Sequence, residues 1–351
     1  MTNDITETIG LDMGDRYTHY CILDHESGEE VGSGRVKTTP MHMEGFLQSH
    51  PQARVVLEVG THSRWTNHIA ETYCAEVLVA NPRKLSFIYR NDRKSDVVDA
   101  ESLARVGRVD PKMLHAVQHR SMPIQADLAV IRARAGVVSA RTKLVNTLRG
   151  VVKSFGWRIP PQAPKRIGHK TLAFVPEELK SALGPLLLAI EALTDEIAEY
   201  DKKIDDLAEK KYPESARFTQ VYGVGNLTAM AYMLTLEDPT RFRNSRSVGA
   251  FLGLVPRRDQ SGAMEKQLSI SKAGDRMVRS LLVQCAHRIL ASNGPDSDLR
   301  RAGERIASRG GRTAKRRAVI AVARKLAVLL HALWRTGATY EPMKNNQVQA
   351  A

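Results

Sequence analysis

GLDMGDRYTHYCILD, at residues 10–24, is the stretch that decides the fold class. A short apolar run ends in the acidic residue Asp12, a glycine follows at Gly14, and a second β-prone stretch begins directly afterwards. Such a pattern predicts two consecutive strands joined by a tight turn, with the Asp12 carboxylate at the end of the first strand. The chemistry that Asp12 serves depends on what the rest of the chain places beside it.

Residues 8–110 alternate between strand-like and helix-like patterns. The runs ARVVLEVG (53–60) and AEVLVA (75–80) are short, apolar and rich in β-branched residues, and the residues between them have helical spacing. After Pro82 the chain becomes polar and then helical again. Alternating strands and helices of these lengths predict an α/β domain.

Two long helical patterns follow. Apolar residues step by three and four from Leu128 to Val145, and a connector rich in Gly, Pro and Lys spans 154–170. A strict heptad alternation then runs through Leu186, Ile190, Leu193, Ile197, Tyr200, Ile204 and Leu207. This predicts a helical hairpin or a coiled-coil arm, and both packing within one chain and dimerisation remain open.

These patterns predict a multidomain chain. Further helical segments are expected near 247–252, 277–292 and 316–334, so the C-terminal region is mainly α-helical. The predicted division is an α/β domain at 1–122, a helical and coiled-coil region at 123–212, a C-terminal domain at 213–340 and a tail at 341–351.

The charge of the chain indicates a polyanionic partner. It has 52 Lys and Arg against 38 Asp and Glu, a net charge of +14. Between Arg300 and Lys325 ten basic residues stand against one acid, Glu304, and part of this stretch, SRGGRTAKRR (308–317), is expected to be flexible. A solvated basic loop is the alternative, but clustered guanidinium groups suit phosphate binding.

Other classes are disfavoured. Three scattered cysteines form neither a disulfide framework nor a zinc motif, and no run of about 18 apolar residues occurs. The polar N-terminus does not resemble a signal peptide. We therefore expect no membrane partner and a cytoplasmic, nucleoid-associated protein.

Four acidic residues stand out by position. Asp12 and Glu58 end two expected strands, while Asp96 and Asp99 lie three residues apart at an expected helix start, on one helix face. If the strands are neighbours, all four carboxylates lie close together and raise one another's pKa, which a divalent cation relieves. Hard oxygen ligands favour Mg²⁺, which also binds substrate phosphate oxygens. The four acids therefore predict a magnesium site.

The positions of these acids allow two other interpretations. Asp96 and Asp99 are also typical of helix N-termini, where acids complement the helix dipole. A strand ending in Asp-x-Gly, as at Asp12, also holds ATP phosphates in sugar kinases and actin-like ATPases. That class requires a second α/β half, and the sequence after residue 123 predicts only helices, which disfavours ATP.

Polar residues are dense between 251 and 286, around Ser261. A serine becomes a nucleophile only with a base or electrostatic activation nearby, and arginines can stabilise the negative charge of a phosphoryl transition state. A turn serine in a basic loop is the simpler explanation from spacing alone. The basic residues predicted to contact nucleic acid are Arg257, Arg258, Lys272, Arg276, Arg279, Arg312, Lys315, Arg316 and Arg317.

Seven motifs occur in a fixed order along the chain: IGLDMG, VLEVG, KSDVVDA, YGVG, FLGLVPRRDQSG, ISKAGDRMVR and LLVQCA. In this order they closely resemble the DEDD-type transposases of the insertion-sequence-110 family, which are related to the Piv DNA invertase. The resemblance extends to about Trp334. It implies an N-terminal RuvC-like domain with a ribonuclease H fold, a coiled-coil segment and a C-terminal transposase domain.

The resemblance also implies the site and the partners. The family's acidic tetrad falls on Asp12, Glu58, Asp96 and Asp99, which would bind Mg²⁺, and its catalytic serine falls on Ser261. That serine is thought to attack a DNA phosphodiester and form a covalent phosphoserine link, with the metal site supplied by another subunit. The implied partners are donor and target DNA, a structured non-coding guide RNA and further copies of the chain, as a dimer or tetramer.

The predicted function is that of an insertion-sequence transposase, which cuts and rejoins DNA through Ser261 and the acidic site. The first alternative is a RuvC-like, metal-dependent junction nuclease that uses water and forms no covalent intermediate. The second is a non-enzymatic DNA- or RNA-binding protein in which the acids only cap helices.

Overall fold

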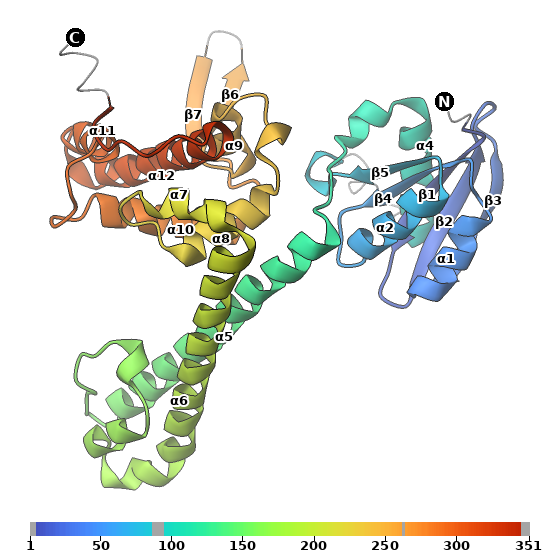
Figure 1. Ribbon diagram of the computed structural model, residues 1–351. Helices are drawn as coiled ribbons and strands as arrows, with labels where there is room; N and C mark the ends of the chain where they lie inside the picture. Colours follow the sequence, from blue (N-terminus) through green and yellow to red (C-terminus); the bar gives the residue numbers. More distant parts are fainter. Residues whose placement is uncertain (1–4, 86–94, 262–263, 345–351) are drawn as a thin grey trace. The chain divides into compact units, whose positions relative to one another are not determined.

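The computed structural model describes residues 5–85, 95–261 and 264–344, with only the backbone described at 258–261 and 264–267. The chain divides into two compact units, Met1–Arg120 and Ser121–Ala351 (Figure 1). None of the helices in the described ranges is long and apolar enough to cross a membrane.

The N-terminal unit is built on a five-stranded mixed sheet in the order β3-β2-β1-β4-β5. Strand β1 pairs antiparallel with β2 and parallel with β4; β2 pairs antiparallel with β3, and β4 parallel with β5. The elements are β1 (Glu7–Met13), β2 (Tyr17–Asp24), β3 (Glu30–Lys37), α1 (Pro40–Gln48), β4 (Ala53–Glu58), α2 (Ser63–Tyr73), β5 (Glu76–Ala80) and α4 (Asp96–Val109).

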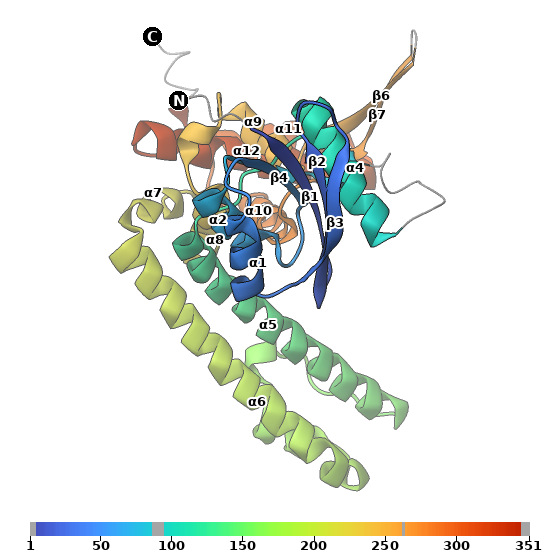
Figure 2. The same cartoon turned by 90° about the vertical axis from the view of Figure 1, so that its right-hand side faces the viewer.

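Helices cover both faces of this sheet, as Figure 2 shows for α1 and α2 on one side and α4 on the other. Successive residues of the central strands point to opposite faces of the sheet. Leu11 and Leu57 belong to the core that includes Met43 of α1, whereas Val56 packs in the core that includes Leu103 of α4. The predicted α/β domain is confirmed at this level, while its RuvC-like identity stays a prediction.

Strand β3 was not expected from the sequence. Its residues, EVGSGRVK, are exposed or half-buried, because β3 lies at the edge of the sheet and packs little of its surface in a core. An edge strand of this kind has no apolar alternation to reveal it. Its backbone pairing with β2, from Tyr17↔Lys37 to Leu23↔Glu30, defines it instead.

The second unit is mainly helical, as predicted. Its core surrounds α8, in which every residue from Thr228 to Leu236 is buried. The Tyr232 hydroxyl donates a hydrogen bond to the Ala327 carbonyl at 2.6 Å and so ties α8 to α12. The elements are α5 (Met122–Ser154), α6 (Glu177–Asp206), α7 (Ala216–Thr219), α8 (Asn226–Leu236), α9 (Arg246–Phe251), β6 (Pro256–Ser261), β7 (Met264–Ile270), α10 (Arg276–Ile289), α11 (Asp298–Ala307) and α12 (Gly311–Thr336).

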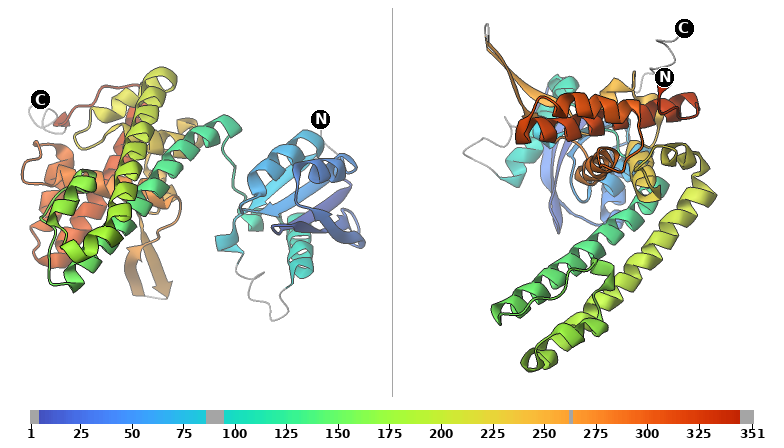
Figure 3. Two further views of the ribbon diagram at one scale, coloured as in Figure 1. Left: turned by 90° about the horizontal axis from the view of Figure 1, so that it is seen from below. Right: turned by 90° about the vertical axis from the view of Figure 1, so that its left-hand side faces the viewer.

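Helices α5 and α6 lie side by side as an antiparallel hairpin within one chain (Figures 1, 2 and 3). Of the predicted heptad positions, Ile190, Ile197 and Ile204 are buried, and Arg134 donates to the Asp201 carboxylate at 2.6 Å across the pair. The helical hairpin is therefore confirmed. A coiled coil and dimerisation through these helices stay predictions.

The basic segment 308–317 is more ordered than expected. Helix α12 begins at Gly311, so the expectation of a flexible SRGGRTAKRR stretch is wrong over most of its length. Ala314 and Ala318 are buried, which fixes the first turns of α12 against the rest of the unit. The surrounding Arg and Lys residues have high helix propensity, and within 308–317 positive φ angles occur only at Gly310 and Gly311.

Candidate active site and nucleic-acid cleft

The four predicted acids lie on elements that meet at one face of the N-terminal sheet. Asp12 lies on β1 and Glu58 ends β4, its parallel neighbour, while Asp96 and Asp99 occupy the first turn of α4. The Ser95 hydroxyl accepts a hydrogen bond from the Val98 backbone N–H, which caps α4 and fixes where its first turn begins.

Two close contacts set the position of α4. Gly10 pairs with Val56 across β1 and β4, and each lies two residues before its strand's acid, on the same face of the sheet. A Cβ on Gly10 would lie 2.0 Å from the Ala100 carbonyl oxygen, and one on Gly107 would lie 2.3 Å from Val56. The helix therefore covers the face to which the side chains of Asp12 and Glu58 also belong.

The electrostatics of Asp12 confirm that the acids are close enough to interact. Partial burial, followed by the charges of Asp96, Asp99 and Glu58, raises the pKa of Asp12 from 3.8 to about 6. Asp99 is itself only 7% exposed, whereas the Asp96 side chain is 66% exposed. The ionised form of a carboxylate whose pKa is raised in this way is strongly stabilised by a nearby cation.

His19 is a member of this cluster that the sequence did not suggest. It pairs with Asp12 across β1 and β2, and its Nδ1 lies 3.5 Å from Oδ2 of Asp96. His19 partly offsets the rise in the pKa of Asp12. The only signal in the sequence was its place seven residues after Asp12, and that becomes meaningful only once the hairpin register is known.

The donor chemistry of the cluster suits a divalent cation, because carboxylate oxygens are hard ligands and their repulsion needs compensation. No three Asp, Glu, His or Cys side chains in the described ranges lie close enough to hold one ion as they stand. The structure thus gathers the four acids on one face without arranging them as a complete ligand set.

Ser261 is the last residue of β6 and pairs with Met264 of β7. The side chains of Ser261 and Arg258 and the whole of Gly262 lie outside the described residues. The C-terminal unit thus presents the predicted serine at the far end of a two-stranded hairpin, which the sequence did not predict. Arg257, on the same strand, is exposed.

The base of this hairpin is held by backbone contacts. Ser271 N–H donates to the Val255 carbonyl at 2.8 Å, and Lys272 N–H donates to the Gly253 carbonyl at 3.1 Å. Arg279 Nη1 donates to the carbonyls of Leu252 and Ala273, on the two chain segments that lead into and out of the hairpin. Arg279 therefore acts as a clamp within the protein, and its predicted contact with nucleic acid stays a prediction.

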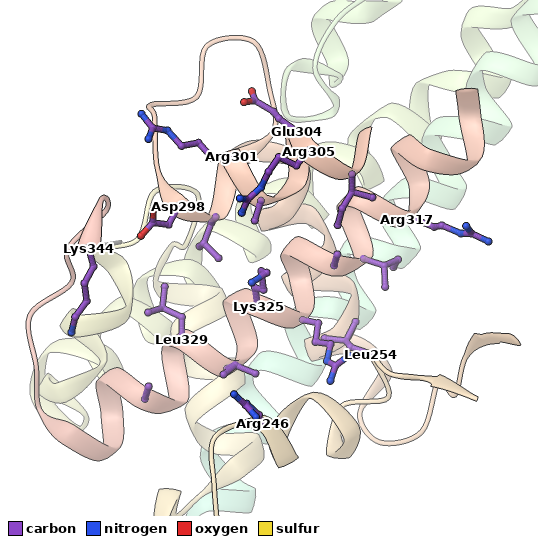
Figure 4. Close-up of a pocket in the computed structure, with 18 of the residues that line it drawn as sticks. Arg246, Leu254, Asp298, Arg301, Glu304, Arg305, Arg317, Lys325, Leu329 and Lys344 are labelled. Atoms are coloured by element: carbon purple, nitrogen blue, oxygen red, sulfur yellow. The ribbon is translucent and has the colours of Figure 1, made fainter. Parts of the chain in front are cut away.

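A large cleft runs along α11 and α12 in the same unit, with a volume of about 1810 Å³ (Figure 4). Apolar side chains such as Leu254 and Leu329 lie in it together with a series of basic groups. The basic residues that line it are Arg246, Arg301, Arg305, Arg309, Arg316, Arg317, Arg324, Lys325 and Lys344. Three acids, Asp298, Glu304 and Glu341, offset part of this charge.

Of the predicted nucleic-acid contacts, Arg316 and Arg317 line the cleft. Arg312 and Lys315 are exposed on the same helix, and Lys272 and Arg276 are exposed near the hairpin base. Arg246 was missed, because it lies on α9, more than 50 residues before the basic run, and reaches the cleft only through the tertiary fold.

Comparison with known proteins identifies the family to which these features belong. Residues 9–156 match the model for DEDD-type IS110 transposases, and residues 215–302 match that described as "Transposase IS116/IS110/IS902 family". The chain belongs to the IS110 family of transposases. As a member it is a DNA transposase, which favours the enzymatic interpretations over a purely binding role.

Individual relatives agree with this membership. The transposase is 29% identical over 342 residues to the transposase for insertion sequence element IS1111A of Coxiella burnetii, covering 95% of this chain and 90% of the relative. It is 29% identical to that for IS1328 of Yersinia enterocolitica, covering 79% and 82%. A shorter match, at 28% identity over 42% of this chain and 46% of the relative, is to the pilin gene-inverting protein of Moraxella lacunata.

Proposed function

We propose that this transposase cuts and rejoins DNA strands through Ser261, with Asp12, Glu58, Asp96 and Asp99 holding a divalent metal, Mg²⁺. The observation that carries the proposal is the gathering of acids from β1, β4 and α4, where partial burial and then the charges of the other acids raise the pKa of Asp12 to about 6. Such a cluster is costly for folding and is expected where charge must meet a cation and a phosphate. The order of the five strands, with β1 between β2 and β4, supports the RuvC-like assignment.

The chemistry consists of two exchanges that balance without an added reactant. The Ser261 oxygen attacks a DNA phosphorus, a phosphoserine bond forms, and the sugar oxygen that leaves takes up a proton. A sugar hydroxyl of another strand then attacks the same phosphorus, releases Ser261 and receives the phosphodiester. A bound divalent cation would stabilise negative charge on the phosphate oxygens, and Asp12 and its neighbours would hold it.

The partners of the reaction are donor and target DNA, bound in part along the basic cleft by Arg316 and Arg317. We extend the proposal to a structured guide RNA and to a homo-oligomer, a dimer or tetramer. The RNA is tested by sequencing the nucleic acid that co-purifies with the protein. An RNA encoded beside the gene supports it, and purified protein that acts on its specific target without any RNA contradicts it.

The serine mechanism is tested by trapping the covalent intermediate. The protein is incubated with its element-end DNA and Mg²⁺, denatured, and analysed for a protein–DNA adduct with the link mapped by mass spectrometry. Ser261→Ala should abolish the adduct and strand exchange, while Asp12→Asn should abolish both and keep DNA binding. An adduct that survives in Ser261→Ala removes the serine assignment.

The second candidate is a RuvC-like junction nuclease that activates water with the same acids. The N-terminal cluster supports it equally, because that cluster contains no part of the serine hairpin. Metal-dependent cleavage by Ser261→Ala, with no adduct in either protein, would favour this nuclease.

A further inference from the structure

We propose that the distal end of the α5–α6 hairpin binds unpaired nucleic acid by stacking bases on exposed aromatic side chains. We call residues 153–176 the hairpin tip. This surface is separate in sequence from the acidic cluster, the serine hairpin and the basic cleft. The inference goes beyond the proposed function and does not depend on the catalytic chemistry.

The tip carries aromatic side chains that its own core leaves out. Val152, Ile167 and Val175 are buried in a small core at this end of the hairpin. Phe155, Trp157 and Phe174 are 56%, 59% and 50% exposed, although apolar core residues are their near neighbours in sequence. Single exposed apolar side chains are common, but three large exposed aromatic groups on one short segment beside a formed core are typical of a binding surface.

The backbone that carries Phe155 and Trp157 is fixed. Helix α5 ends at Ser154, and the N–H groups of Phe155 and Trp157 both donate to the Val152 carbonyl, at 3.3 and 3.2 Å. Gly156 between them has a φ of +80°, which closes the helix with a left-handed residue. The two aromatic rings thus project from a defined turn, which lowers the entropy lost when they bind.

The charge of the tip is of one sign. No Asp or Glu occurs between Asp127 and Glu177, whereas ten Lys and Arg do. Five of them belong to the tip, are exposed, and have no salt bridge to any described residue: Lys153, Arg158, Lys165, Arg166 and Lys170. Glu191 of α6, which contacts the tip, is hydrogen bonded to Nδ1 of His169 at 2.7 Å, and this bond lowers the pKa of Glu191.

Exposed aromatic rings interleaved with cations fit a single strand better than a duplex. Unpaired bases offer faces on which Phe and Trp stack, and the phosphates that join them meet the basic side chains. In a duplex the faces are stacked internally and only the phosphates remain available. The tip residues 153–176 include no acid and five exposed cations, so a polyanion such as nucleic acid is the occupant that the charge favours.

Trp157 provides a direct readout, because Trp65 and Trp334 are both partly buried. The full-length protein is titrated with a uridine oligoribonucleotide, a thymidine oligodeoxyribonucleotide of equal length, and a duplex. We expect the single strands to quench the tryptophan fluorescence and the duplex to leave it unchanged. Tighter binding of the ribose form assigns the surface to RNA, and tighter binding of the deoxyribose form assigns it to displaced DNA.

Variants separate stacking from charge. Trp157→Ala and Phe155→Ala should each weaken binding of the labelled single strands by about 5- to 100-fold, because one stacked base contributes on that order. Trp157→Phe should remain within about threefold of the wild type, since a ring is kept. Lys165→Ala with Arg166→Ala should make the salt dependence shallower by about 1.4 in the log–log slope.

Two substitutions on α6 serve as matched controls. Leu188→Ala removes an equally exposed apolar side chain that cannot stack, and Lys202→Ala removes a lysine that is paired with Glu199. Both should leave binding unchanged. Equal quenching by duplex, unchanged affinity in Trp157→Ala, or an altered oligomeric state with unchanged affinity overturns the proposal. Adduct formation at Ser261 is assayed separately, so either proposal can fail alone.

Discussion

Gly10 of β1 lies against Ala100 of α4 so closely that a Cβ on Gly10 would lie 2.0 Å from the Ala100 carbonyl oxygen. This contact places the first turn of α4, with Asp96 and Asp99, on the same face as Asp12. The glycine that opens the GLDMG motif thus sets the spacing between a strand and a helix, two residues before the first acid.

Gly10→Ala should destabilise the protein. The added methyl group meets backbone atoms that cannot rotate away, so α4 must shift, and overpacking of this kind costs about 1–3 kcal/mol. Thermal unfolding measures the loss. Gly45→Ala is the matched control, because Gly45 lies in α1 with nothing within 4 Å of an added Cβ. It should be neutral or slightly stabilising, and an equal loss in both variants contradicts the contact.

Asp12 should make the metal-free protein less stable as the pH rises. Its pKa is raised from 3.8 to about 6, so the folded state binds the proton more tightly than the unfolded state. The stabilisation is complete below about pH 4 and is lost as the pH rises through about 6. As the pH rises from 4 to 8, the unfolding free energy of Asp12→Asn should therefore increase by about 1–2 kcal/mol relative to that of the wild type. This figure allows for solvent screening.

Asp15→Asn provides the control for this pH dependence. The Asp15 side chain is 96% exposed, so its replacement should leave the change of stability with pH as in the wild type. Urea unfolding at several pH values in the presence of a chelator measures both variants. Parallel stability curves for the wild type and Asp12→Asn would falsify the shifted pKa.

Divalent cations should stabilise the wild type and leave Asp12→Asn unchanged. A ligand that binds only the folded state raises the unfolding free energy by about 2.7 kcal/mol at a hundred times its dissociation constant. The melting temperature is recorded with Mg²⁺, with Mn²⁺ and with a chelator, at pH 8, where Asp12 is ionised. An equal rise in Asp12→Asn would show that the cations bind elsewhere.

Arg279→Ala should loosen the base of the serine hairpin. The guanidinium bonds the carbonyls of Leu252 and Ala273 at 3.1 and 2.7 Å, and losing hydrogen bonds from a charged donor costs about 1.5–3 kcal/mol. Proteolysis should cut the hairpin faster, and adduct formation at Ser261 should fall. Arg276→Ala, at the exposed start of α10, should leave proteolysis unchanged. Equal resistance to proteolysis in Arg279→Ala and Arg276→Ala would contradict the role of Arg279 in holding the hairpin base.

Arg316→Ala should weaken the binding of duplex DNA to a similar extent whatever the base sequence of the DNA. Arg316 lines the basic cleft, and each lost phosphate contact lowers the log–log salt slope by about 0.9. Fluorescence anisotropy at several salt concentrations measures the slope, with Lys202→Ala as the paired-lysine control. An unchanged slope in Arg316→Ala would place the DNA away from the cleft.

Much of the fold could be predicted because local chemistry marks it. Apolar runs with β-branched residues revealed β1, β2, β4 and β5, and three- and four-residue steps revealed α5 and α6. Strand β3 and the β6–β7 hairpin could not be found in this way, since their residues are polar and their pairing partners define them. The helical start of α12 was hidden by two glycines in a basic run.

The sequence by itself determined which residues could carry the chemistry: acids at the ends of apolar runs and a serine among arginines. Its net positive charge also indicated a polyanionic partner. Only the tertiary structure decided which of them meet. The parallel pairing of β1 with β4 and the approach of α4 to Gly10 bring Asp12, Glu58, Asp96 and Asp99 to one face. Folding likewise adds His19 to the acidic cluster and Arg246 to the basic cleft, and it leaves Trp157 59% exposed. These outcomes depend on packing between distant segments, which no local pattern encodes.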